Sequence, residues 1–331
     1  IPVITFCTNL ATLIILVLGG SFVIGGSMTL GEFTAFNSYI AILIFPILII
    51  GFMSNVIAQA SASYARINEV LSAPGEMKVG GEQQELRGDI SVRHVSVRYG
   101  EKQILKDISF SVTGGQKVAV IGPTAAGKTQ LLYMLTGLLA PTEGEISFDG
   151  IRIDRYDQEN LHRQIGFVFQ DSVLFNLSLR ENIAFSNDAK DEDIALAIKT
   201  AELSDFVDTL PNKLDTVVSE RGTSLSGGQK QRIMLARALA LNPKVLLLDD
   251  FTARVDTETE RKILANLSAN YPHLTLISVT QRIASVAHYD QIILLMEGEI
   301  LAKGTHEELV HSSPEYVQIA DSQRSTSEYE L

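Results

Sequence analysis

Hydrophobic and charged positions are divided unevenly along this chain. Within residues 1–65 the only charged residue is Glu32, and all other acidic and basic residues lie from Arg66 onward. Residues 3–26 form an uncharged run that is long enough to cross about 30 Å of hydrocarbon as a helix. A second apolar run extends from about Phe36 to Ile57. This pattern predicts an α-helical transmembrane segment joined to a domain of soluble composition.

Two membrane helices are therefore expected, at about residues 3–26 and 36–57, with Ser27–Phe33 as a short polar hairpin between them. Pro46 lies inside the second run, where a proline is tolerated because neighbouring helices can satisfy the carbonyl group that it frees. Beyond this run the pattern becomes amphipathic, so we expect the second helix to continue into the cytosol as far as residue 71.

The alternatives are a signal peptide and a buried hairpin of a soluble fold. A signal peptide has a basic start and a shorter apolar core, and neither is present; a buried hairpin with a single charge, Glu32, is disfavoured. Arg66, Lys78 and Arg87 follow the second helix, so the positive-inside rule places that side in the cytoplasm. We expect a multi-pass protein of the plasma (inner) membrane, in contact with the lipid bilayer.

Composition restricts the function further. The chain has 331 residues with 27 Lys and Arg against 39 Asp and Glu, a net charge of −12, which disfavours nucleic acid as a partner. Cys7 is the only cysteine, which excludes an intrachain disulfide and a multi-cysteine metal site. Two helices cannot enclose a pathway across a membrane and the sequence does not begin with Met, so we expect it to be the C-terminal piece of a larger protein.

A linker is expected at residues 72–87, a globular domain at 88–320 and a flexible tail at 321–331. Alternating patterns predict strands at Ile90–Tyr99 and Ile108–Val112, and the short apolar run Lys117–Ile121 predicts a buried strand.

The run Lys117–Ile121 leads directly into GPTAAGKT, which matches G-x-x-x-x-G-K-[ST] and precedes an apolar-periodic helix. A strand before the motif and a helix after it form the context of a phosphate-binding loop, whose backbone N–H groups attract an anion. Lys128 is expected to reach the β- and γ-phosphates, and Thr129 to hold Mg²⁺. The residues expected to contact the nucleotide here are Gly122, Pro123, Thr124, Ala125, Ala126, Gly127, Lys128, Thr129 and Gln130.

Two further motifs follow the loop. The apolar run Lys244–Leu248 ends in Asp249 and Asp250, the Walker B pattern, and Asp249 is expected to bind the metal through water. Between the Walker motifs lies Leu225–Gln229, with the sequence LSGGQ. Alone, Ser-Gly-Gly is only a helix-capping turn, but its position between the Walker motifs makes it far more specific.

Together these motifs resemble the nucleotide-binding domain of ABC transporters, and the chain resembles exporters whose membrane and ATPase parts are fused. The likeness covers about residues 88–320, and the two preceding helices resemble the last two of the usual six. It implies an α/β P-loop ATPase domain with a RecA-like core, a helical subdomain at about residues 171–229, and ATP and Mg²⁺ as cofactors.

The resemblance also assigns roles to single residues. Tyr99 matches the aromatic residue that stacks on adenine, and Gln170 matches the Q-loop glutamine that contacts Mg²⁺ and couples to the membrane part. Glu220–Gly222 matches a stretch that contacts coupling helices, and Asp256 matches the D-loop aspartate. The family forms head-to-tail dimers, in which the signature serves the partner's ATP. Its expected contacts are Ser226, Gly227, Gly228 and Gln229.

The sequence departs from the family pattern at the site of hydrolysis. Asp250 stands where a glutamate is the usual general base, and its side chain is about 1.5 Å shorter; a base must come within about 2.6–3.2 Å of its proton or act through one water. Gln281 replaces the switch histidine, and it neither titrates nor carries charge. Ala125 replaces a frequent glycine, which costs about 1 kcal/mol if its φ is positive. Arg254 stands where the D-loop usually has small residues.

Asp250 and Gln281 belong to this chain's own Walker site, whereas its LSGGQ is intact. We therefore favour the degenerate-site subunit of a heterodimeric exporter, paired with a second half-transporter chain that carries the glutamate and the histidine. The alternatives are a homodimeric exporter in which Asp250 acts as the base, and a regulatory subunit that binds ATP without hydrolysing it. A soluble ABC ATPase is disfavoured by the apolar block. The sequence leaves the transported substrate unidentified.

Overall fold

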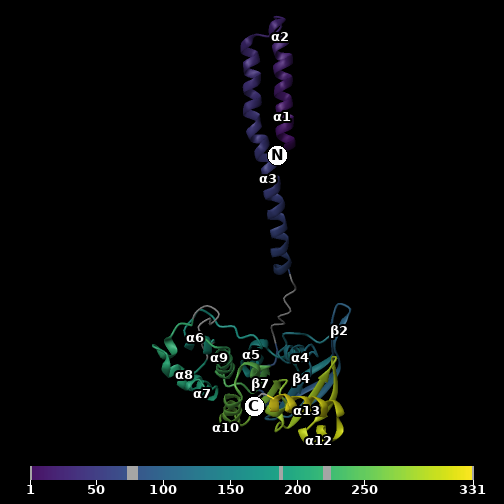
Figure 1. Ribbon diagram of the computed structural model, residues 1–331, viewed down its shortest axis with the longest axis vertical. Coiled ribbons are helices and arrows are strands. Elements are labelled where there is room, and N and C mark those ends of the chain that lie inside the picture. The colour runs from purple at the N-terminus through teal and green to yellow at the C-terminus, as the bar shows by residue number, and fades with distance from the viewer. Residues whose placement is uncertain (1, 73–80, 186–188, 219–224, 330–331) are drawn as a thin grey trace. The chain divides into compact units, whose positions relative to one another are not determined.

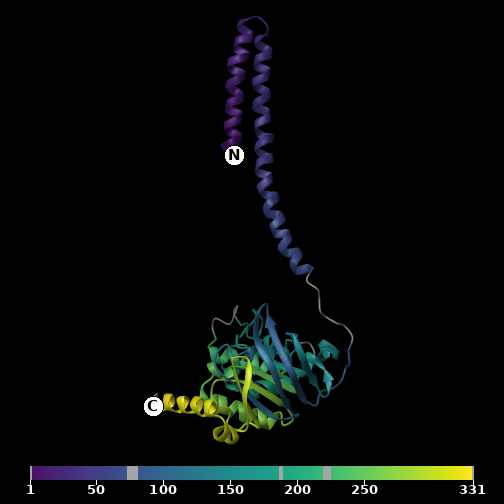
Figure 2. The same ribbon diagram turned by 90° about the vertical axis from the view of Figure 1, so that its right-hand side faces the viewer.

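The chain forms two compact units, residues 1–76 and residues 77–331. Figures 1 and 2 show that the first is a helical hairpin and the second a layered α/β domain. Lys78 and Glu220–Gly222, which the sequence analysis used, lie outside the described residues. The computed structural model describes residues 2–72, 81–185, 189–218 and 225–329.

The N-terminal hairpin packs through glycines. A Cβ at Gly19 would lie 2.7 Å from Cδ2 of Phe33, and one at Gly51 would lie 3.0 Å from Cδ1 of Ile4. Small residues therefore let the two helical arms approach closely. By length and composition alone, both arms could cross a membrane. The elements are α1 (Pro2–Ile14), a π-helical turn (Ile15–Gly19), α2 (Gly20–Ile24) and α3 (Leu30–Leu71).

The second helix begins earlier than the sequence analysis expects, at Leu30 rather than near Phe36. The cause is a capping box: the Glu32 N–H donates to Thr29 Oγ1 at 3.3 Å, and the Thr29 N–H donates to Glu32 Oε2 at 2.8 Å. These bonds satisfy backbone donors that a helix start leaves free. Glu32 therefore lies in the first helical turn, and the expected polar hairpin through Phe33 is wrong.

Two sheets form the C-terminal unit. The larger has the order β10-β9-β3-β8-β7-β6, and only its edge pair β9 and β10 is antiparallel. The smaller is antiparallel, in the order β2-β1-β4-β5. The strands are β1 (Ile90–Tyr99), β2 (Lys102–Val112), β3 (Lys117–Ile121), β4 (Glu143–Phe148), β5 (Ile151–Arg152), β6 (Ile165–Val168), β7 (Val245–Asp249), β8 (Thr275–Val279), β9 (Gln291–Met296) and β10 (Glu299–Gly304).

The parallel strands are buried on both faces. In β7, Leu247 packs in a core with the small sheet and α4, whereas Leu246 packs in a second core with α9 and α10. Apolar runs without polar alternation are typical of parallel strands covered on both sides. The observed bounds of β1 and β3 confirm the strands expected at Ile90–Tyr99 and Lys117–Ile121. The strand expected at Ile108–Val112 begins earlier, at Lys102.

Short helices surround the sheets, and α6 to α8 lie between β6 and the signature, where the helical subdomain is expected (Figure 1). The α-helices are α4 (Lys128–Leu135), α5 (Gln158–Gln164), α6 (Leu179–Ile183), α7 (Asp191–Thr200), α8 (Ser204–Thr209), α9 (Gly227–Leu239), α10 (Thr257–Asn270), α11 (Ile283–Val286), α12 (His306–Ser312) and α13 (Pro314–Tyr329). The 3₁₀ turns are η2 (Ile153–Arg155), η3 (Lys213–Asp215) and η5 (Phe251–Arg254).

Both ends of the domain differ from expectation. Leu86, expected in the linker, is 2% exposed within the core, and the Glu82 N–H donates to the Arg155 carbonyl at 2.9 Å. The domain therefore begins before residue 88. The tail expected from residue 321 lies within α13, which extends to Tyr329, and Gln323 of this helix bonds the loop after β8.

Replacing Leu247 with alanine tests the buried sheet. Leu247 is 0% exposed, so Leu247→Ala should lower the free energy of unfolding of the C-terminal unit by about 2–5 kcal/mol. The control, Leu301→Ala on β10, alters a side chain that is 48% exposed and should cost less than about 1 kcal/mol. Urea unfolding of the chain in detergent measures both, and equal losses would contradict this account of the core.

Candidate nucleotide site

The predicted site residues meet at one edge of the large sheet. The strands β3, β8, β7 and β6 are neighbours and parallel, so their carboxyl ends lie side by side. The phosphate-binding loop follows β3, and Gln281 follows β8. Asp249 ends β7 and Asp250 follows it, and Gln170 follows β6. The carboxyl edge of an open α/β sheet is the usual place for a ligand.

Two glycines shape the loop between β3 and α4. Gly122 has φ +153°, and a Cβ there would lie 2.0 Å from the Leu295 carbonyl oxygen. Gly127 has φ +100°, and a Cβ there would lie 2.5 Å from Cδ2 of Leu105. Side chains at either position would displace the loop from the strands beneath it. Of the other predicted contacts, Ala126 is buried beneath the loop, Pro123 and Thr124 are exposed, and Gln130 lies in α4.

Ala125 has φ +66°. This is the left-handed region, which costs an L-residue with a Cβ about 1–2 kcal/mol. The sequence alone does not determine the conformation of this residue, and in the structure Ala125 adopts the positive φ that carries this cost. The loop therefore holds local strain at a residue where glycine would fit without it.

Lys128 folds back over the loop. Its Nζ donates to the Gly122 carbonyl at 2.9 Å and to the Pro123 carbonyl at 2.7 Å. Burial lowers the pKa of Lys128, and the carboxylates of Asp250 and Asp249 act in the opposite direction. These contacts hold a cation at the loop where the phosphate groups of a nucleotide would lie.

Asp249 and Thr129 provide a pair of hard oxygen ligands. Asp249 is 2% exposed, and burial raises its pKa, while a hydrogen bond from the Thr129 hydroxyl lowers it. Within the described residues no group of three or more His, Cys, Asp or Glu side chains is gathered for a metal. The Asp249 carboxylate and the Thr129 hydroxyl are oxygen donors of the kind that Mg²⁺ takes, usually one or two from the protein together with phosphate oxygens and water.

Asp250 has an unusual backbone. Its φ is +47°, its N–H donates to the Val279 carbonyl at 3.0 Å, and it precedes the 3₁₀ turn η5. Asp and Asn visit the left-handed region more readily than longer side chains. The strand end therefore presents a partly exposed carboxylate on a short side chain.

The switch position is fixed from two helices. Gln323 of α13 donates from Nε2 to the Gln281 carbonyl at 2.5 Å and accepts the Ile283 N–H at 2.9 Å. Arg282 donates to Oε2 of Glu260 on α10 at 3.4 Å, and burial raises the pKa of Glu260. Gln323 and Glu260 could not be predicted from the sequence, because no local motif marks residues so far apart in the chain.

The signature begins a helix at a second place on the domain. Ser226 is the N-cap of α9: its Oγ accepts the Gln229 N–H at 3.2 Å, and its own N–H donates to Gln229 Oε1 at 2.9 Å. A Cβ at Gly228 would lie 2.9 Å from the Arg254 carbonyl oxygen, and the Arg254 side chain covers Gly227. Arg254 also lies 4.0 Å from the exposed Asp171 carboxylate.

Two other predicted residues lie at element ends. Tyr99 ends β1 and is 55% exposed, so its ring is open to a planar ligand. Among the described contacts, none joins Tyr99 to the phosphate-binding loop. Asp256 is the N-cap of α10 and accepts the Thr259 N–H at 2.9 Å.

An exposed apolar patch, which the sequence analysis missed, lies beside Gln170. Contiguous apolar surface marks an interaction site more often than scattered apolar residues do. Phe175 and Phe185 are stacked with ring centroids 5.0 Å apart. The patch comprises Val173, Phe175, Leu177, Phe185 and Val217, each more than a third exposed. Phe169, which is 37% exposed, contacts Tyr133 and Phe167.

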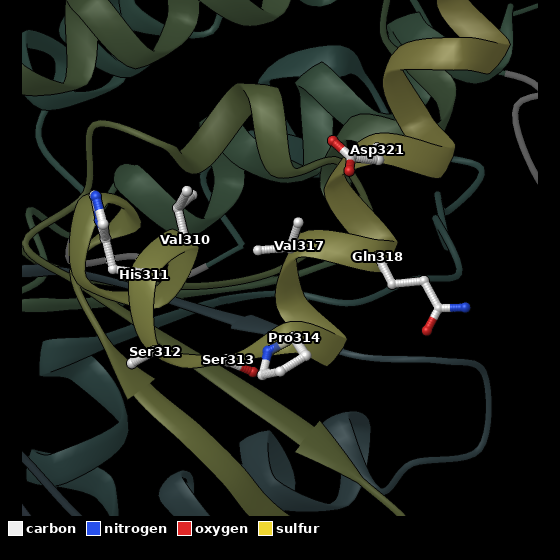
Figure 3. A pocket seen from close by; sticks show the side chains of 8 residues that line it. All are labelled: Val310, His311, Ser312, Ser313, Pro314, Val317, Gln318 and Asp321. Carbon is white, nitrogen blue, oxygen red and sulfur yellow. The ribbon is translucent and has the colours of Figure 1, made fainter.

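An open hollow between α12 and α13 lies away from the strand ends (Figure 3). Val310 and Val317 lie on facing sides of it, and Gln318 and Asp321 belong to α13. None of the residues predicted to contact ATP or metal lines it. This hollow is therefore separate from the predicted nucleotide site.

Comparison with known proteins agrees with this geometry. Residues 105–253 match the family model described as ABC transporter. The chain is 37% identical over 97% of its length to an uncharacterized ABC transporter ATP-binding protein, YknU, of Bacillus subtilis (strain 168), and covers 56% of that protein. It is 38% identical over 95% of its length to the probable multidrug resistance ABC transporter ATP-binding/permease protein YheI of the same organism, covering 55% of it.

A solved structure of a bacterial Atm1-family ABC exporter with ATP bound has a TM-score of 0.74 and 31% sequence identity, covering 97% of this chain and 57% of that chain. The chain thus spans about half the length of the relatives that it matches. The likeness extends through both the helical hairpin and the α/β domain. The chain therefore consists of N-terminal apolar helices fused to an ABC ATPase α/β domain.

Proposed function

We propose that this chain is part of an ABC half-transporter of the plasma (inner) membrane that binds ATP tightly, hydrolyses it slowly at its own Walker site, and supplies an intact signature to a non-identical partner. One observation carries this proposal. Asp250 and Gln281, both departures from the family pattern, lie at the same sheet edge as Lys128, while the signature residues begin a separate helix.

The proposed binding step uses the loop and the end of β7. Backbone N–H groups of the loop and Lys128 would hold the phosphates, and Tyr99 would stack on the adenine. Thr129, Asp249 and Gln170 would hold Mg²⁺, which when bound would neutralise charge on the phosphates. Every one of these residue types is retained, so the site keeps what binding requires.

The proposed weakness lies in water activation. The Asp250 carboxylate is one methylene, about 1.5 Å, further back than a glutamate carboxylate would be. General-base catalysis contributes about 10²–10⁴-fold and requires close approach of the base to its proton. Gln281 can donate a hydrogen bond to a phosphate, but it adds no positive charge. Both losses act on hydrolysis rather than on binding.

The partner would be a second half-transporter chain with a glutamate and a histidine at these two positions. Its ATP would meet Ser226, the glycine N–H groups and the positive N-terminus of α9. The exposed apolar patch beside Gln170 is a suitable contact surface for a membrane part of the assembly. The transported substrate would be selected by membrane helices, and export is proposed from the fusion of helices and ATPase.

Restoring the two family residues tests this assignment. The purified chain, in which a second copy can supply the signature, should turn over ATP more slowly than about 1 s⁻¹, the low end for enzymes. The variant with Asp250→Glu and Gln281→His should hydrolyse at least about tenfold faster, because it regains base and charge. Adding Lys128→Ala to this variant is the control and should remove the gain. Brisk turnover by the unaltered chain, or no gain in the variant, would contradict the proposal.

Ala125→Gly tests the strain in the loop. Removing the Cβ removes about 1–2 kcal/mol of strain from the folded state at the positive φ. The greater conformational freedom of glycine in the unfolded chain lowers stability by about 0.5–1 kcal/mol. The nucleotide-free C-terminal unit should therefore gain stability, by up to about 1.5 kcal/mol. Ala126→Gly is the matched control: its φ is not positive, so it should lose stability. Denaturant unfolding compares the two, and a loss in both would show that Ala125 is unstrained.

A further inference from the structure

The residues that flank Gln170 are hydrogen-bonded to α9, the helix that begins with the signature. Gln231, on α9, donates from Nε2 to the Phe169 carbonyl at 3.4 Å, and its Oε1 accepts the Ser172 hydroxyl. These two partners stand on either side of Gln170 in the chain. Gln231 is 1% exposed, so both of its polar ends are satisfied in a setting where an unpaired amide would be costly.

The helix that carries Gln231 begins with the signature. Ser226 is its N-cap, and Gln231 lies little more than one turn further along α9. A helix of this length moves as a unit, because its backbone hydrogen bonds and its packed face hold it straight. A displacement of the backbone around Gln170 must therefore either break its hydrogen bonds to Gln231 or move α9 together with the signature at its start.

Arg237 extends the same attachment to the apolar patch. Its Nε donates to the Asn182 carbonyl at 2.6 Å and its Nη1 to the Val173 carbonyl at 3.1 Å. The guanidinium carbon lies 5.6 Å from the ring centroid of Phe175 and 5.2 Å from that of Phe185. Burial lowers the pKa of Arg237 to about 10, so it stays charged at neutral pH. Figure 1 shows α9 beside α6, in the segment that these bonds hold.

We propose that Gln231 is a positioning residue for Gln170, and that it couples Mg²⁺-ATP at this chain's own Walker site to the placement of the signature that serves the partner's nucleotide. The inference rests on the proposed function, which gives Gln170 its contact with the metal. Coupling of this kind is reciprocal: what fixes Gln170 also fixes α9. The two nucleotide sites of the assembly thus communicate through one buried amide of this chain.

The Mg²⁺ dependence of ATP binding by the full chain in detergent tests the positioning role. The measured quantity is the ratio of ATP affinities with Mg²⁺ and with EDTA. Gln231→Leu removes both bonds and should lower this ratio about 3–10-fold, while the affinity in EDTA stays within about twofold. Ser172→Ala removes one bond from a partly exposed residue and should cause a smaller fall.

The matched control is Gln318→Leu, the same substitution at an exposed position of α13 (Figure 3), and it should leave the ratio unchanged. The double variant with Gln231→Leu and Ser172→Ala should be no worse than Gln231→Leu alone, because the two residues act through one bond. An unchanged ratio in both Gln231→Leu and Ser172→Ala would overturn the positioning role.

Hydrogen exchange of α9 tests the coupling itself. Mg²⁺-ATP should slow exchange of the amides of residues 225–235 in the unaltered chain and in Gln318→Leu, but not in Gln231→Leu. Equal protection in Gln231→Leu would overturn the coupling. The failure of the proposed function gives different results: brisk ATP turnover by the unaltered chain if its slow hydrolysis is wrong, and ATP binding without Mg²⁺ dependence in the unaltered chain if its metal contact is wrong.

Discussion

The parallel pairing of β3, β8, β7 and β6 is the constraint on which the rest of the structure depends. It brings four loop segments, separated by long stretches of sequence, to one edge. The apolar side chains on both faces fix the register of these strands, so the polar side chains at their ends have little freedom of position. The phosphate-binding loop, the acidic pair and the switch glutamine are therefore neighbours because the sheet is buried.

At this edge of the sheet, the charge of the side chains and the length of the Asp250 side chain affect different steps. Lys128 and Asp249 are partly or fully buried and influence each other's protonation, which suits a site that holds phosphate and metal. Asp250 differs from the family residue in length rather than in charge. A site can thus keep its affinity and lose its rate, because binding depends on charge, whereas water activation depends on distances of a few tenths of an ångström.

Features that depend on neighbours in sequence could be predicted from the sequence. The Gly-rich loop, the acids after a buried strand and the signature are each local patterns, and the structure has them on the expected strand ends and helix. The helix start at Leu30 was also readable, since Thr29 and Glu32 have capping-box spacing, but the polar residues there favoured a hairpin. Whether Ala125 has a positive φ depends on the close approach of Gly122 and Gly127 to the strands, which no local pattern states.

Contacts between segments that are distant in the chain could not be predicted from the sequence. Gln231 with Ser172, Gln323 with Gln281, and Arg237 with Phe185 are brought together only by the fold, and glutamine or arginine in a helix gives no sign of a buried partner. Each of these contacts joins a segment outside the regular elements to a helix: the loops after β6 and β8 in the first two, and the end of α6 in the third. The helices thereby set the position of residues that the motifs alone leave undetermined.

The identity of the nucleotide retained by the chain tests the central claim most directly. The chain is incubated with Mg²⁺ and ATP, separated rapidly from free nucleotide, and the bound fraction is released by acid and analysed after increasing delays. The account predicts that ATP remains the bound species through many minutes. Recovery of mostly ADP at the earliest times would contradict it, because the short carboxylate would then be activating water efficiently.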